Sequence, residues 1–168
     1  IGLKIMAYKE DFMVRIVYEE GLEAIAKRIA QASDGDTVKL ENAMEAPVVL
    51  EEVDSIGLVY FKCGKDISDR MVRFIREGLG SIELKGLEYL FSVCVCKGKA
   101  KPHYALKVVN RLCSQIGCLP SYSRAVSADE DSIEQVCIDI QKESIRLADG
   151  NPLVGIYMKA NRKRFKDA

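Results

Sequence analysis

The chain has 168 residues, of which 48% are hydrophobic and 30% are charged, and its formal net charge is zero. This length and composition suit one globular domain with a sizeable core. They exclude a membrane span, because no apolar run reaches the ~18 residues that a span needs. Residues 1–12 have scattered charges and no long apolar core, so we expect no signal peptide.

The N-terminal part of the chain alternates strand and helix patterns. Residues 1–12 are either an added edge strand or a leader from an early start site, and the sequence leaves both open. Val14–Tyr18 is rich in β-branched residues and predicts a buried strand. The apolar spacing of Leu22–Ala30 predicts a helix. Thr37–Leu40 alternates as an outer strand does, and Ala43–Val53 predicts a loop or one helical turn.

The middle of the chain repeats this alternation. Ile56–Phe61 predicts a second buried strand, and Asp69–Leu79 predicts a helix with Ser68 as its N-cap. Leu87–Val95 is the most apolar predicted strand. A helix over Pro102–Ile116 follows, with proline at a first position, where a missing N–H costs nothing.

The C-terminal part adds one strand, one long helix and a basic tail. Pro120–Val126 predicts a more polar strand, and Asp131 or Ser132 is the expected cap of a helix that ends before Gly150. Residues 13–158 then form the predicted domain. The tail, residues 159–168, holds five of the 25 basic side chains and one acidic side chain. A solvated chain end is its plainest interpretation, with nucleic acid or anionic lipid as the alternative.

Five strands that alternate with helices predict a parallel sheet covered by helices on both faces. The first strand and helix contain IVY (Ile16–Tyr18) and EAIAKRIA (Glu23–Ala30), and these segments resemble the opening of flavodoxins. The resemblance covers residues 13–147. It implies a doubly wound α/β/α domain with strand order 2-1-3-4-5, in which ligands bind at the carboxyl ends of the strands.

The loop between these two segments differs from the family's phosphate loop. Flavodoxins have several Ser, Thr and Gly residues there, which hold the phosphate of FMN. This chain has only Glu19, Glu20 and Gly21. Ionised carboxylates suit a helix N-terminus but repel a phosphate, so we expect this loop not to bind FMN in the flavodoxin manner.

Two further loops match the flavin-binding loops of the family by position. The resemblance implies flavin contacts from five residues, which are Phe61, Cys63, Gly64, Cys96 and Gly98. Lysines crowd the same two loops, where they could bind an anionic ligand or simply be solvated. These candidates are Lys62, Lys65, Lys97, Lys99 and Lys101.

The remaining reactive side chains are best explained without a catalytic or metal-binding role. The six cysteines form no CxxC pair, and most fall in apolar elements, so we expect reduced, buried thiols in a reducing cytoplasm. Cys63, on a loop, is the expected exception. Cys94 and Cys96 share one face of a strand and suit core packing better than a metal site. His103, the only histidine, lacks a Ser or Asp partner, so no catalytic group or metal site is expected.

Two functions remain open from the sequence. The favoured one is a flavodoxin-like domain that has lost canonical FMN binding and serves as a binding or structural module. Its partner would be another protein, a second copy of the chain or an anionic ligand, with no nucleic acid expected. The alternative is an FMN-dependent electron-transfer protein, in which the flavin supplies the redox chemistry.

Overall fold

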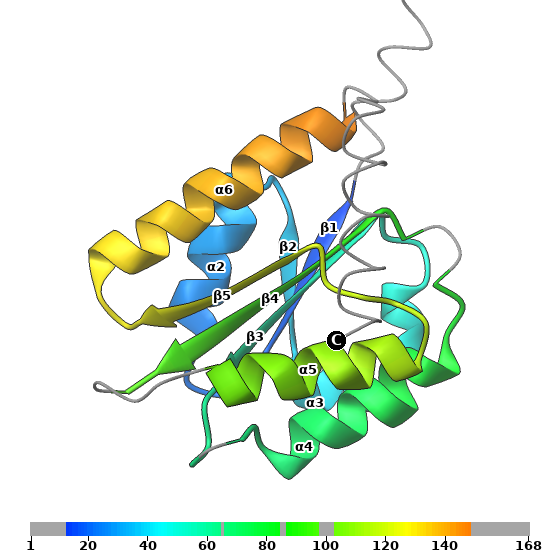
Figure 1. Ribbon diagram of the computed structural model, residues 1–168. Helices are drawn as coiled ribbons and strands as arrows, with labels where there is room; N and C mark the ends of the chain where they lie inside the picture. The colour runs from blue at the N-terminus through cyan, green and yellow to red at the C-terminus, as the bar shows by residue number, and fades with distance from the viewer. Residues whose placement is uncertain (1–12, 65, 85–86, 98–102, 149–168) are drawn as a thin grey trace, which may run out of the picture.

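Five parallel strands form a single sheet at the centre of the molecule (Figure 1). The computed structural model describes residues 13–64, 66–84, 87–97 and 103–148. The strand order is β2-β1-β3-β4-β5, which confirms the predicted doubly wound α/β fold. The strands are β1 (Val14–Tyr18), β2 (Asp36–Lys39), β3 (Ser55–Phe61), β4 (Tyr89–Cys96) and β5 (Tyr122–Ser127).

The most apolar strands occupy the middle of the sheet. Every residue of β4 is buried, as are all residues of β3 except Phe61, whereas β2 at the edge is partly exposed along its length. Gly57 of β3 lies opposite Phe91 of β4, and a Cβ at Gly57 would stand 2.2 Å from the Phe91 ring. Glycine at this position therefore makes room for a fully buried aromatic ring between the strands.

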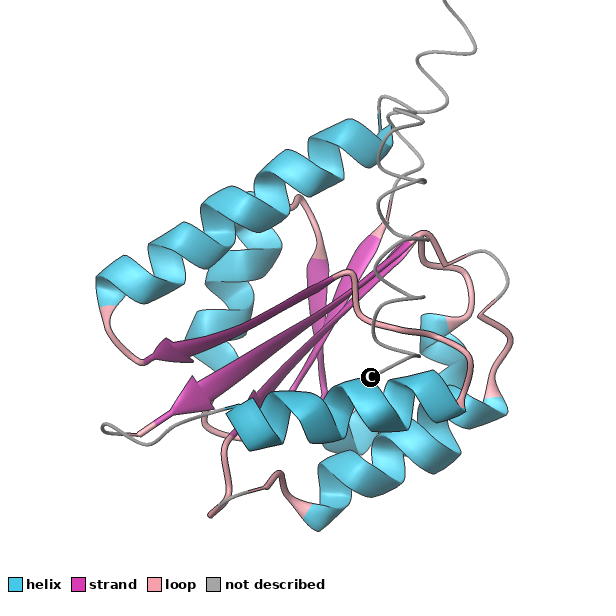
Figure 2. Ribbon diagram, in the orientation of Figure 1, coloured by secondary structure: helices cyan, strands magenta, loops and turns pink. Residues whose placement is uncertain are grey.

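Helices cover both faces and give three layers (Figure 2). One face is covered by α2 (Glu23–Ala32) and α6 (Glu130–Ala148). The opposite face is covered by shorter helices and by α5 (His103–Gln115). The shorter elements are α3 (Leu40–Glu45), the 3₁₀ turn η1 (Pro47–Leu50), α4 (Asp69–Arg73), the π-helical turn η2 (Phe74–Gly78) and the 3₁₀ turn η3 (Leu79–Ser81).

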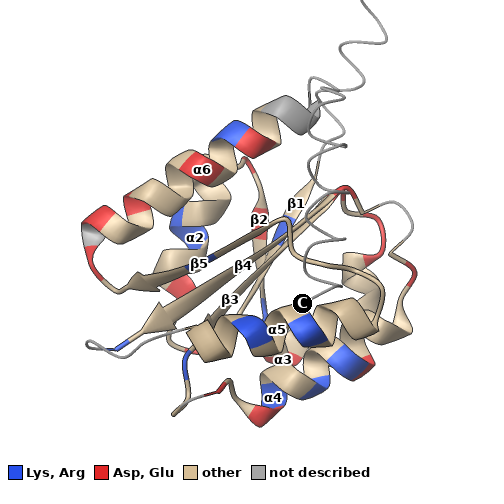
Figure 3. Ribbon diagram, in the orientation of Figure 1, with Lys and Arg blue, Asp and Glu red and all other residues tan. Residues whose placement is uncertain are grey.

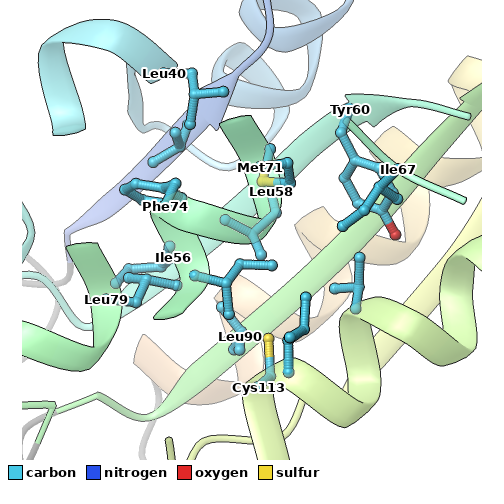
Figure 4. Close-up of a cluster of buried hydrophobic side chains, with 14 of the residues drawn as sticks. Leu40, Ile56, Leu58, Tyr60, Ile67, Met71, Phe74, Leu79, Leu90 and Cys113 are labelled. Atoms are coloured by element: carbon cyan, nitrogen blue, oxygen red, sulfur yellow. The ribbon is translucent and has the colours of Figure 1, made fainter. Parts of the chain in front are cut away.

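The larger of two apolar clusters lies beneath the face that α3, α4 and α5 cover (Figure 4). Leu58, Met71 and Phe74 are fully buried there. The hydroxyl of Tyr60 is also buried, and it lies 2.6 Å from the Ser92 hydroxyl, so the polar end of this ring is satisfied inside the cluster.

The structure corrects several details of the sequence predictions. The helix predicted over Asp69–Leu79 is α-helical only over Asp69–Arg73 and continues as a π-helical turn and a 3₁₀ turn. Leu40 does not end the second strand: it begins α3, because its side chain packs into the core below the sheet. Residues 43–53 accordingly contain the end of a helix and a 3₁₀ turn rather than a loop or a single turn. The cap of α6 is Asp129, not Asp131 or Ser132, since its Oδ1 accepts a hydrogen bond from the Ser132 N–H at 2.9 Å.

Other details agree with the predictions. Ser68 caps α4, as the sequence predicted, with its Oγ accepting from the Met71 N–H at 3.2 Å. Three predicted features lie outside the described residues: the N-terminal extension (residues 1–12), Pro102 as the first residue of its helix, and the basic tail. No helix in the described ranges is long and apolar enough to cross a membrane.

Candidate functional site

The carboxyl ends of β1, β3 and β4 meet at one edge of the sheet. The strand order reverses direction between β1 and β3, so this edge is where a doubly wound fold places its ligand. Three loops begin here, at Glu19, Lys62 and Lys97. The structure therefore brings together the three loops that the sequence singled out.

The first loop is short and tightly hydrogen-bonded to the sheet. The N–H of Glu19 donates to the carbonyl of Val59 at 3.1 Å, and the N–H of Leu22 donates to the carbonyl of Glu19 at 3.1 Å. Gly21 has a φ of 94°, which lets the chain turn sharply into α2. Leu22 is the N-cap residue of that helix, and its side chain makes no capping hydrogen bond to the first N–H groups.

A carboxylate stands at the N-terminus of α2 instead. Glu23 Oε1 accepts from the Gly21 N–H at 3.3 Å. Hydrogen bonds from its own N–H and from that of Gly21 lower the pKa of Glu23, so this side chain is an anion at neutral pH. The helix start thus already carries a negative charge.

The carboxylate of Glu19 turns inward and joins three elements. Its Oε1 accepts from the N–H of Phe61 at the end of β3, at 2.8 Å. Its Oε2 accepts from Ser68 Oγ at 2.7 Å. Ser68 is itself the cap of α4, so one half-buried carboxylate links the β1 loop to β3 and to the next helix.

Sequence reasoning missed this role of Glu19. Its partners lie 42 and 49 residues further along the chain. No local pattern signals such a contact, because an acidic residue in a short loop is usually solvated. The nearest signal was the cap at Ser68, which the sequence did predict.

Phe61 lies between the first loop and the third. Its ring approaches Gly21, where an added Cβ would be 3.5 Å from the ring edge. Lys97 Nζ lies 5.0 Å from the ring centroid, within the range of a cation–π contact. The ring is half-buried and packs against the cluster on the α2 and α6 side of the sheet.

The second loop is a tight turn that exposes a thiol. Cys63 and Asp66 exchange two backbone hydrogen bonds, at 2.8 and 2.9 Å, and Gly64 between them has a φ of 61°. Lys62 Nζ donates to the carbonyl of Gly64. Cys63 is exposed, as the sequence predicted.

The third loop is only partly described. Cys96 is buried in the core cluster together with Cys94, which confirms the predicted core packing of this pair. Lys97 is exposed, and His103 is exposed at the first residue of α5. Gly98 and three of the five candidate lysines lie outside the described residues. Those lysines are Lys65, Lys99 and Lys101.

Comparison with known proteins identifies the architecture. No protein-family model matches the sequence, and no curated protein matches it significantly. Among solved structures, a flavodoxin from the domain Archaea aligns with a TM-score of 0.61 and 12% identity over 79% of this chain and 99% of its own. The chain has a flavodoxin-like fold.

Two further structures support this fold. The flavodoxin of Megasphaera elsdenii aligns with a TM-score of 0.60 and 20% identity, covering 77% of this chain and 99% of its own. Rubredoxin oxygen:oxidoreductase from Desulfovibrio gigas aligns with a TM-score of 0.66 and 11% identity over 86% of this chain. The alignment spans 39% of that longer protein, so the flavodoxin-like fold corresponds to one part of it.

The donors at this edge bind an anionic side chain of the protein itself, the carboxylate of Glu19. Among the described residues no group of His, Cys, Asp and Glu is arranged to hold a metal ion. The described side-chain hydrogen bonds at the first loop are made by Glu19 and Glu23, and both carboxylates act as acceptors. Two of the described cations near this edge are already engaged: Lys62 is bound to a backbone carbonyl and Lys97 lies over a ring.

Proposed function

We propose that this chain is a flavodoxin-fold binding module that does not hold FMN by its phosphate. The observation that carries the proposal is the inward carboxylate of Glu19. It accepts from the Phe61 N–H and from Ser68 Oγ, so two donors at the ligand edge are already used. Two of the neighbouring structures with this fold are flavodoxins by name, and the short acidic first loop is the main difference of this chain from that family.

Electrostatics oppose a phosphate in this loop. A phosphate site needs several N–H groups turned toward the anion and, usually, hydroxyl donors. Glu19, Glu20 and Gly21 are too few to curl around a phosphate, and two of them are acids. A like charge at about 4 Å costs on the order of 4 kcal/mol at an effective dielectric of about 20. A phosphate dianion would meet a larger penalty.

The partner that this edge suits is anionic. Lys62 and Lys97 flank the site, and Lys65, Lys99 and Lys101 belong to the same two loops in the sequence. Lysine side chains on neighbouring loops attract acidic groups over a distance of about one Debye length. We therefore infer that an acidic protein surface, or a small anion, binds on the lysine side of the edge rather than in the first loop.

The alternative function is FMN-dependent electron transfer. The observation that favours it is Phe61, an aromatic ring at the carboxyl end of β3 beside the first loop. In that case the loops of Cys63 and Gly64 and of Cys96 and Gly98 would flank the flavin, and Cys96 would contribute its backbone because its side chain is buried in the core. The flavin ring would then have to stack on the Phe61 ring, and Lys97 would have to move away from its position over Phe61.

Titration of the purified protein with FMN, followed by flavin fluorescence quenching, tests the two functions. We expect no saturable quenching at micromolar FMN. Glu19→Ser removes the blocking charge and supplies a hydroxyl, and Glu20→Ser is the matched control one residue away. Any gain in FMN or inorganic phosphate binding should be clearly larger for Glu19→Ser than for Glu20→Ser, because only Glu19 occupies the Phe61 N–H.

Two outcomes would contradict the proposal. Submicromolar FMN binding by the unaltered protein would support the electron-transfer alternative. Binding of that strength that survives alanine at Lys62 and Lys97 would show that the first loop itself accepts the phosphate. Loss of weak phosphate binding in the lysine variants would instead support an anion site on the lysine side.

A further inference from the structure

The outward face of α6 carries two exposed isoleucines. The side chains of Ile138 and Ile145 are 39% and 55% exposed, and they are two helical turns apart on the same side. Val136 and Ile140 are buried against the rest of the protein. Each is about 200° around the helix from Ile138, so the isoleucines point away from the core.

The same face of α6 is acidic toward its N-terminal end. Asp131 and Glu134 are exposed and lie on the line that continues through Ile138 to Ile145. Figure 3 shows that acidic positions recur along this helix. We call this line of residues the α6 ridge. Its members are Asp131, Glu134, Ile138, Gln141, Lys142 and Ile145.

The chain continues past α6 with a complementary sequence. Gly150, Asn151 and Pro152 are turn formers. The apolar residues 153–158 come next, followed by the basic tail. These residues lie outside the described part of the structure, which ends at Ala148. Read backward from the helix end, the ridge offers the two isoleucines, with Lys142 and Gln141 between them, and then the two acids. The segment likewise has its apolar residues before its basic ones.

We propose that residues 153–166 turn back at 150–152 and dock along the α6 ridge. Leu153–Met158 would cover Ile145 and Ile138, and Lys159–Lys166 would reach Glu134 and Asp131. The helix axis from Ala148 to Ile138 is about 15 Å long, and six extended residues span about 20 Å. The segment is therefore long enough to place its basic residues beside the acidic end of the ridge.

Docking of this segment removes an apolar surface that would otherwise face water. Each isoleucine that is covered gains by the apolar area removed from solvent. The pairing of Lys and Arg with Asp131 and Glu134 adds a smaller contribution that salt weakens. This assignment does not depend on the FMN proposal, because the ridge lies on a helix face and not at the ligand edge.

Limited chymotrypsin cleavage of the full chain after Tyr157, followed by mass spectrometry, tests the docking. The double substitution Ile138→Asp and Ile145→Asp should raise the cleavage rate about tenfold, because cleavage tracks the open population. Val48→Asp is the control: Val48 is 62% exposed on η1, on the opposite face of the sheet, and its substitution should leave the rate unchanged. Asp131→Lys with Glu134→Lys should raise the rate at low salt and not at high salt.

Both substituted isoleucines are exposed, so the fold should be retained, and circular dichroism checks this. Ile145→Asp alone serves as the second variant if the double variant loses its signal. Equal cleavage rates in the unaltered protein and in either folded variant would overturn the proposal. A dimer of the full chain that these substitutions dissociate would also overturn it, by assigning the ridge to a second copy.

Discussion

Glu19 shows how one side chain can join three elements at the edge of a sheet. Its two oxygens satisfy a backbone N–H of β3 and the hydroxyl that caps α4. Each hydrogen bond of a half-buried carboxylate contributes more than a neutral one, because one partner is charged. The residue therefore stabilises the carboxyl edge of the sheet.

Replacement of Glu19 by alanine should destabilise the protein by about 1–3 kcal/mol. The substitution removes both hydrogen bonds and leaves the Phe61 N–H without its acceptor. Urea unfolding measures the change. Glu20→Ala is the matched control, because Glu20 is exposed and a surface substitution of this kind usually changes stability by less than about 0.5 kcal/mol. Equal losses in the two variants would show that the Glu19 contacts contribute nothing specific.

At the scale of elements, the caps decide where helices begin. Ser68 begins α4 in the place that the sequence predicted. Asp129 begins α6, where it accepts from the Ser127 hydroxyl and from the Ser132 N–H. These contacts lower the pKa of Asp129, with the Ser127 hydrogen bond as the largest cause. The cap therefore works through the ionised carboxylate.

The lowered pKa of Asp129 predicts a loss of stability in acid. A carboxyl group whose pKa is lower in the folded state stabilises the fold above its unfolded pKa, and this contribution is lost as the pH falls through the folded pKa. Asn at position 129 can still cap the helix but cannot titrate. Urea unfolding of the unaltered protein and of Asp129→Asn should thus differ most near neutral pH, and the difference should shrink below about pH 4. A difference that is constant with pH would contradict this role.

At the scale of the whole molecule, the sheet and its two helical layers enclose most of the thiols. Cys94, Cys96, Cys113 and Cys118 are buried, and Cys137 is half-buried. Burial, together with the neighbouring thiol of Cys96, raises the pKa of Cys94 to about 12. Burial also raises the pKa of Cys113. The thiols of Cys94 and Cys113 are therefore protonated and inaccessible at neutral pH.

Thiol titration of the native protein should therefore show one fast group. Cys63 is exposed in the second loop, and we expect it to react first with an aromatic disulfide reagent. Cys63→Ser should remove the fast phase, and the buried thiols should react only after unfolding in urea. Rapid labelling of three or more cysteines without denaturant would contradict this expectation.

The sequence by itself determined the strands, the longer helices and the order of the sheet. Local periodicity suffices for these, because a buried parallel strand is apolar throughout and a surface helix is apolar on one side. It therefore predicted Val14–Tyr18 to the residue and β3 within one residue of its start. The strand order followed from the alternation of elements and from the resemblance to flavodoxins.

Only the tertiary structure decided what the carboxyl edge contains. Glu19 meets Phe61 and Ser68 across more than 40 residues of chain. A side chain's partner at such a separation depends on how strands and loops pack, which no local pattern encodes. Leu40 is a similar case. The polar–apolar alternation of residues 37–40 predicted a strand there, but Leu40 packs into the core and begins α3. A sequence pattern determines an element where buried residues recur regularly along it. The individual side-chain contacts at the ends of elements depend on tertiary packing.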